Sequence, residues 1–174
     1  MKKRISLILL AALTMFGCTR TARLYPVQGP LSAQTPAPVV LARITGTLNP
    51  GDISVVLGDG EVCRGRWARV PSIDVARGAT TATVPVTGDM SVVWDTVYGT
   101  GFYVAHVLGA RLYAQAVVTG NRGTVINVEL YKPEQQHEAD VFFDRAIQHG
   151  DGGSFGAIKG VARDNKGNIF KIVM

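Results

Sequence analysis

The pattern of apolar and polar residues changes character twice along the chain. Residues 5–16 are almost continuously apolar, a run shorter than the roughly 20 residues that cross a bilayer as a helix. Residues 19–38 contain four of the eight prolines and follow neither helical nor strand periodicity, which predicts an extended tether. From residue 39 onward, short β-branched runs alternate with Gly, Asp and Asn, which predicts a β-rich domain over residues 39–174.

The first strands of this domain are predicted at residues 39–46 and 53–57. Gly58-Asp59-Gly60 follows them, and Asp-Gly between two alternating runs predicts a hairpin because its turn needs positive φ. The returning strand covers residues 61–67. Its side chains alternate between two faces, with Cys63, Gly65 and Trp67 on one and Arg64 and Arg66 on the other.

We expect Trp67 to point into the core, and Gly65 to mark a bulge or to leave room for the indole. Cys63 shares their face, and free cysteine often behaves as a small core hydrophobe. A buried Cys63 beside Trp67 is therefore expected, whereas a reactive thiol or a disulfide between two chains is the alternative.

An ungapped internal repeat relates residues 114–130 to residues 158–174. Both copies have Asn, a cation and Gly near their centre, as Asn121-Arg122-Gly123 and Asn165-Lys166-Gly167. Each copy is predicted as two strands joined by a tight turn, and Gly58-Asp59-Gly60 forms a third, looser copy. The inward positions are predicted to be Ala114, Ala116, Val118, Ile126, Val128, Leu130, Phe170, Ile172 and Met174. The predicted fold class is mainly β, an antiparallel meander closing into a small sandwich or barrel, with one short helix.

The predicted helix covers residues 133–150, where apolar residues recur at helical spacing between a proline and a glycine. It would cover an open end or face of the β domain, and a strand through residues 141–143 is the alternative. Residues 90–94 are predicted as a strand, and a short helix over residues 102–108 is left open. The aromatic and glycine-rich stretch 98–103 fits core packing better than the lining of a ligand cavity.

The first eighteen residues, MKKRISLILLAALTMFGC, combine a basic head with a short apolar run, which is typical of an export signal. Met15-Phe16-Gly17-Cys18 resembles the lipobox of bacterial (Gram-negative) lipoproteins, although leucine is usual where Met15 stands. The resemblance implies cleavage before Cys18 and lipidation of that residue, by acyl chains such as palmitate. Thr19 follows in place of the aspartate that favours inner-membrane retention, so the resemblance implies the periplasmic face of the outer membrane. An ordinary secretory signal cut elsewhere is the alternative.

The chain is thus expected to consist of a signal peptide (1–17), a lipidated Cys18 with a proline-rich tether (18–38), and the β-rich domain (39–174). Removing residues 1–17 leaves 15 Lys and Arg against 13 Asp and Glu, a net charge of +2 in place of +5. The remaining chain has no basic run, so nucleic acid is not expected as a partner.

No motif typical of catalysis is present: Gly-x-Ser-x-Gly, the phosphate-binding Gly-x-x-x-x-Gly-Lys-Ser/Thr and His-Glu-x-x-His are all missing. We therefore expect no enzymatic activity and no cofactor. The weak candidates for metal ligands are His137, Asp140, Asp144 and His149. A solvated helix face is the preferred interpretation of these residues, because His149 lies outside their three- and four-residue spacing.

Five cations are predicted on outward strand positions: Arg64, Arg66, Arg111, Lys159 and Arg163. If neighbouring strands align them, they form a cationic strip that would meet phosphate-bearing lipid or an acidic partner. A dispersed, solvated set of charges is the alternative.

The lipobox, the proline-rich segment, the GEVCRGRW strand and the closing GVARDNKGNIFKI hairpin together resemble small bacterial envelope lipoproteins with no assigned activity. The resemblance implies location and general build. From the anchor and the absence of a catalytic motif, we expect a structural or interaction module of the cell envelope, held to the membrane by the lipid on Cys18, with an envelope protein as a possible partner. The first alternative is a periplasmic module that binds a small ligand or metal through residues 98–106 or 137–151. An envelope hydrolase is the second.

Overall fold

The computed structural model describes residues 19–46, 50–70, 89–110, 113–133 and 158–174. The described strands are β1 (Thr19–Gln28), β2 (Val40–Thr45), β3 (Gly51–Val56), β4 (Val62–Arg69), β5 (Tyr113–Thr119), β6 (Val125–Tyr131), β7 (Lys159–Asp164) and β8 (Ile169–Val173). The described helices are α3 (Ser91–Tyr98) and the π-helix η2 (Tyr103–Val107).

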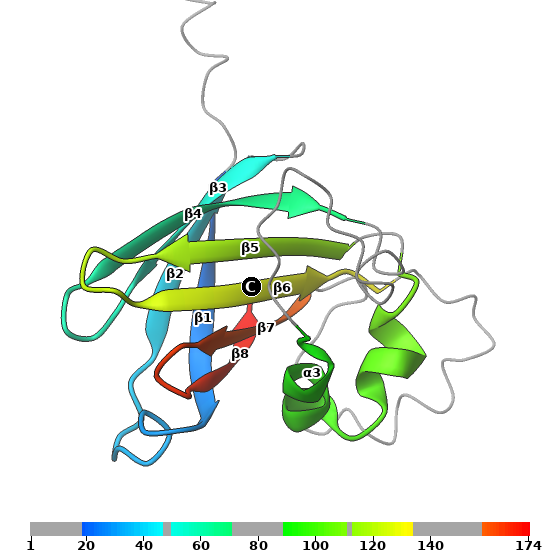
Figure 1. The fold of residues 1–174 in the computed structure, drawn as a ribbon, viewed down its shortest axis with the longest axis horizontal. Coiled ribbons are helices and arrows are strands. Elements are labelled where there is room, and N and C mark those ends of the chain that lie inside the picture. The colour runs from blue at the N-terminus through cyan, green and yellow to red at the C-terminus, as the bar shows by residue number, and fades with distance from the viewer. Residues whose placement is uncertain (1–18, 47–49, 71–88, 111–112, 134–157) are drawn as a thin grey trace, which may run out of the picture.

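The strands form one closed barrel in sequence order, as Figure 1 shows. Every strand pairs antiparallel with the next, and β8 pairs with β1, for example at Ile172 and Leu24, so that no edge of the sheet is left open. The structure therefore confirms a mainly β antiparallel meander and selects the barrel over the sandwich.

Apolar side chains at alternate strand positions fill the interior of the barrel. This core cluster contains Ala22, Leu24, Val40, Ala42, Ile44, Ile53, Val55, Leu57, Cys63, Trp67, Ala116, Val118, Ile126, Val128, Leu130, Ala162, Phe170 and Ile172. Period-two alternation explains the pattern, because strands of a small barrel direct every second side chain inward. The buried positions predicted for Cys63 and Trp67 and for the two repeated hairpins are confirmed, and Ala114 and Met174 pack at the margin of the cluster.

The tether predicted over residues 18–38 is wrong for residues 19–28, which form β1. Ala22 and Leu24 are buried, and β1 has hydrogen-bonded neighbours on both sides. Pro26 is tolerated because it lies beyond the last residue paired with β2 and beside an irregularity in the pairing with β8. The domain thus begins at least twenty residues before the predicted boundary at residue 39, since residues 19–38 are part of it.

The strand predicted at residues 90–94 is also wrong, because residues from Ser91 onward form α3. Val93 and Trp94 are adjacent and both buried, and they lie together on the side of α3 that packs against the outer wall of the barrel. Asp95 then accepts hydrogen bonds from the backbone N–H groups of Gly101 and Tyr103, which joins α3 to η2. The helical conformation left open for residues 102–108 is present as η2.

Gly65 marks neither a bulge nor space for an indole. Its pairing with β3 and β5 is regular, and a Cβ built there would lie 2.1 Å from the carbonyl oxygen of Val117. Gly65 is therefore needed for the close approach of β5. Room for the Trp67 indole comes from Gly51, where a built Cβ would lie 2.3 Å from Nε1 of Trp67.

A second apolar cluster lies outside the barrel, where α3 packs on β7 and β8 (Figure 1). It consists of Val70, Met90, Val93, Trp94, Tyr103, Val107, Tyr113, Tyr131, Val161 and Ile169. The helix predicted at residues 133–150 lies outside the described residues apart from Pro133. Among the described helices, none has the length and apolar character needed to span a membrane.

Candidate functional site

Several residues singled out from the sequence lie outside the described residues. These are Cys18, Arg111 and the four weak metal candidates His137, Asp140, Asp144 and His149. Within the described residues, no group of three or more His, Cys, Asp or Glu side chains is arranged to hold a metal ion. The remaining candidate sites within the described residues are charged and aromatic surfaces.

The predicted cationic strip is split between two sides of the barrel. Arg64 and Arg66 point outward from β4, whereas Lys159 and Arg163 belong to β7. Register places Arg66 in one cross-strand row with Arg163, but Val117 and Asn127 stand between them. Three strand spacings separate the two arginines by about 14 Å. The strip predicted from these residues is therefore not continuous.

Arg64 and Arg66 instead belong to a cationic face on β1–β4. The outward positions of these strands bring Arg43 of β2 and Arg23 of β1 to the same side, and Ser54 is the cross-strand neighbour of both Arg43 and Arg64. The face carries four cations, Arg23, Arg43, Arg64 and Arg66, and its acidic residue is Asp52. Among the described residues, no carboxylate forms an ion pair with any of these four arginines. We call this surface the arginine face.

An apolar row crosses the same surface. Val173, Arg23, Leu41, Val56 and Val62 follow one another as direct cross-strand partners from β8 to β4. The four aliphatic side chains are exposed, at 42% for Val173, 49% for Leu41, 47% for Val56 and 38% for Val62. Exposed aliphatic residues are ordinary when scattered, but here they are contiguous and bordered by arginine. The arginine face is thus amphipathic.

A ladder of aromatic rings lies on the other side of the barrel, along α3 and η2. Trp94 stacks on Tyr98, Tyr98 on Phe102, and Phe102 lies against His106, with ring centroids 4.7 to 5.6 Å apart. The ammonium of Lys159 lies 5.3 Å from the Phe102 centroid, and that of Lys171 lies 5.7 Å from the Tyr98 centroid. The aromatic residues of the stretch 98–103 therefore pack in an apolar cluster, as predicted. Lys159 forms cation–π contacts with two of these rings.

The Glu129 carboxylate is buried beneath this ladder. Trp94 Nε1–H donates to its Oε2 at 2.6 Å, and the Gln115 side-chain amide donates to its Oε1 at 3.0 Å. Tyr113 is also hydrogen-bonded to Glu129, and burial together with the Glu129 charge raises the pKa of the Tyr113 hydroxyl. These contacts surround the carboxylate with donors, as a buried charge requires.

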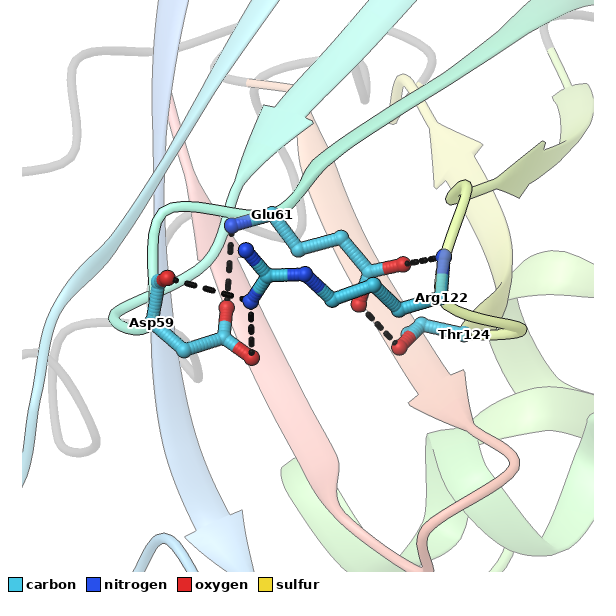
Figure 2. Close-up of polar contacts among 4 residues, drawn as sticks. All are labelled: Asp59, Glu61, Arg122 and Thr124. Carbon is cyan, nitrogen blue, oxygen red and sulfur yellow. Dashed lines mark hydrogen bonds and ion pairs between the residues drawn. The ribbon is translucent and has the colours of Figure 1, made fainter.

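A second buried carboxylate, Glu61, holds together two turns at the opposite end of the barrel (Figure 2). Its Oε1 accepts the backbone N–H of Arg122 at 2.7 Å, and its Oε2 accepts the hydroxyl of Thr124 at 2.6 Å. The Thr124 hydrogen bond is the main cause that lowers the pKa of Glu61. The Arg122 guanidinium lies 3.5 Å from the Asp59 carboxylate in an exposed ion pair that adds little.

The neighbouring turn is attached in the same way. Asn165, in the turn between β7 and β8, accepts from the backbone N–H of Val125 and donates to the carbonyl oxygen of Gly123. Asn168 accepts from the backbone N–H of Leu31 and donates to Asp164. Glu61, Asn165 and Asn168 therefore link neighbouring turns around this end of the barrel. Their polar atoms form hydrogen bonds that stabilise the fold.

Neither buried carboxylate nor the thiol is arranged for catalysis. Both oxygens of Glu61 and of Glu129 already accept hydrogen bonds, and Cys63 is fully buried, which raises the pKa of its thiol. Searches of protein-family models, curated proteins and solved structures give no match to the chain. The candidate functional site is therefore the arginine face.

The sequence identified only half of this face. Alternation along β4 predicts Arg64 and Arg66 as outward residues, whereas no local pattern marks Arg43 and Arg23 falls within the predicted tether. The missing information was strand adjacency, because Arg23 and Arg43 reach the face only when β1 and β2 pair beside β3 and β4.

Proposed function

We propose that this protein is a periplasmic lipoprotein anchored to the outer membrane through Cys18, and that it serves the cell envelope as a non-enzymatic structural or interaction module. The observation that supports a module acting through its surface is the interior of the barrel, which apolar side chains fill. An eight-stranded barrel is just wide enough for side chains to fill its interior, and where they do so the outer surface is left for contacts. The arginine face is the surface on which such a module would act.

The anchor in this proposal comes from the lipobox-like Met15-Phe16-Gly17-Cys18. Several acyl chains on one residue hold a protein at a bilayer, whereas a single chain gives only marginal binding. Thr19, the residue after the cysteine, supports the outer membrane as the location. An envelope protein that meets the arginine face is a second partner consistent with an interaction module.

The deciding experiment is mass spectrometry of the protein extracted from its own membrane with a mild detergent. Under denaturing conditions we expect the mass of residues 18–174 plus acyl chains. The Cys18→Ala variant should lose the acyl mass and leave the membrane fraction. Cys63→Ala is the matched control, since it removes a buried cysteine and should leave acylation unchanged. An unmodified Cys18 in the native protein contradicts the proposal.

Native mass spectrometry of the same sample distinguishes an interaction module from a module that binds a small ligand or metal. A bound protein, or further copies of the chain, supports an interaction module. A retained small molecule or metal ion would instead favour the periplasmic binding module. Turnover of a cell-wall or lipid substrate by the purified protein would favour a hydrolase and contradict the non-enzymatic assignment.

A further inference from the structure

We propose that the arginine face docks side-on against an anionic lipid surface, so that the barrel lies on the membrane with β1–β4 toward the headgroups. This inference rests on the proposed function for the attachment at Cys18, and it adds an orientation and a second, reversible contact. The ligand is the phosphate of anionic phospholipids.

The charge of the face fits this ligand. Arg23, Arg43, Arg64 and Arg66 outnumber Asp52, and no described carboxylate neutralises them through an ion pair. Guanidinium groups form paired hydrogen bonds to phosphate oxygens, and cations near an anionic leaflet are attracted to it. Four outward arginines on neighbouring strands therefore provide a multivalent contact for headgroups.

The apolar row fits the same surface. Leu41 and Val56 are direct cross-strand partners, as are Val56 and Val62, and all three are exposed. An interfacial protein surface combines such side chains, which enter the boundary between headgroups and acyl chains, with cations that reach the phosphates. Arg23, the direct partner of Leu41, places a cation within the row itself.

The position of the anchor favours this orientation. In the sequence Cys18 directly precedes Thr19, the first residue of β1, so the proposed acylation site is adjacent to a strand of the barrel. Four residues of extended strand place Arg23 about 13 Å from Thr19. Because Arg23 belongs to β1 itself, the membrane that holds Cys18 lies within reach of the face.

The remaining surface is less suited to the task. On β5 and β6 the outward positions carry one charged residue, Glu129, which is buried. On β7 and β8 the side chains of Lys159 and Lys171 lie over aromatic rings, and Arg163 is the remaining outward cation. Within the described strands, β1–β4 is therefore the part of the barrel wall with a cluster of uncommitted cations.

Sedimentation with vesicles tests the proposal on the chain from residue 18, which contains every described element, carrying Cys18→Ala so that no acyl group contributes. Vesicles contain phosphatidylethanolamine and phosphatidylglycerol at a ratio of about 3:1, or phosphatidylcholine alone. We expect binding to the anionic vesicles and little to the neutral ones. The Arg43→Gln/Arg64→Gln variant should bind about tenfold more weakly or worse.

The matched control is Arg122→Gln/Lys166→Gln, which removes the same charge from turns outside the face and should bind as the parent does. Circular dichroism and thermal midpoints confirm that each variant folds. If both double variants lose vesicle binding equally, the binding depends on net charge alone and the proposal is overturned. Failure of the parent chain to bind anionic vesicles would overturn it as well, even if the arginines bind an acidic protein.

Orientation is tested with a fluorophore at a single cysteine in the Cys18→Ala/Cys63→Ala background. Ser54→Cys lies between Arg43 and Arg64, whereas Asn127→Cys lies on β6. Lipids with a quencher near the headgroup should quench the label at residue 54 and leave the label at residue 127 bright. The reverse order would contradict side-on docking. Neither test uses acylation, so an unmodified Cys18 would refute the anchor without changing these results.

Discussion

The indole of Trp94 donates a 2.6 Å hydrogen bond to the carboxylate of Glu129, thirty-five residues later in the chain. Trp94 comes from α3 and Glu129 from the outward side of β6, so the bond ties the helix to the wall of the barrel. Both side chains are almost fully buried, and stacked rings cover them. The position of α3 is thus set by a charged hydrogen bond inside an apolar contact.

Trp94→Phe should destabilise the protein by about 1–3 kcal/mol, because it keeps a ring in place but removes a donor from a buried carboxylate. Urea unfolding followed by circular dichroism measures the loss. Val92→Ala, on the exposed side of the same helix, is the control and should change the unfolding free energy by less than about 0.5 kcal/mol. Equal stability of Trp94→Phe and the parent would show that the bond contributes nothing.

Leu24→Ala should cost about 2–5 kcal/mol, since the side chain is buried in the barrel core. This substitution separates a strand from a tether, because a residue in a solvated tether tolerates truncation. Chemical denaturation gives the measurement, and Val27→Ala, an exposed position of the same strand, gives the comparison. If both variants match the parent, β1 does not belong to the barrel.

Gly51→Ala should destabilise by about 1–3 kcal/mol, because the added methyl group would lie 2.0 Å from the carbonyl oxygen of Thr45 and 2.3 Å from the Trp67 indole nitrogen. Thr45 also accepts the Trp67 N–H hydrogen bond through that carbonyl, so the overlap strains a donor and its acceptor together. The thermal midpoint is the measurement. Gly58→Ala meets no atom within 4 Å and should be neutral or slightly stabilising.

Thr124→Val should reduce stability at neutral pH and lose this effect in acid. The Thr124 hydroxyl is the largest cause of the lowered pKa of Glu61, so the bond stabilises the folded state while Glu61 is ionised. That stabilisation is complete above the ordinary pKa of 4.5 and is lost as the pH falls through the lower pKa of the folded state.

Urea midpoints of the parent and of Thr124→Val, taken from pH 7 down to about 2, provide the test. The gap between the two curves should be largest at neutral pH and should narrow below pH 4.5. Thr119→Val, on an exposed strand position, should run parallel to the parent. A gap that stays constant with pH would mean that Thr124 acts through packing alone.

The strands that could be predicted are those with a local turn signal. Gly60, Gly123 and Gly167 all have positive φ, and their hairpins appear where the sequence placed them. β1 was missed because the prolines around residues 26–38 outweighed a short alternation at Ala22 and Leu24, and because its partner β8 comes last in the chain. Pairing over such a separation leaves no periodic signal in either segment.

The helix α3 was missed for a different reason. Val92 and Val93 favour a strand locally, and only the burial of Val93 and Trp94 against the outer wall of the barrel selects the helix. For the candidate site, alternation identified Arg64 and Arg66, whereas the rest of the arginine face depends on which strands are neighbours.

The seam between β1 and β8 determines the order of assembly. Leu24 and Ile172 are cross-strand partners, so the ring of strands closes only when its first and last strands meet. Until β8 pairs with it, β1 has one unsatisfied edge, and such edges recruit other chains. We therefore expect closure of the seam to be late and slow, because contacts of long sequence separation cost the most loop entropy. Protection against aggregation would therefore be needed longest on β1.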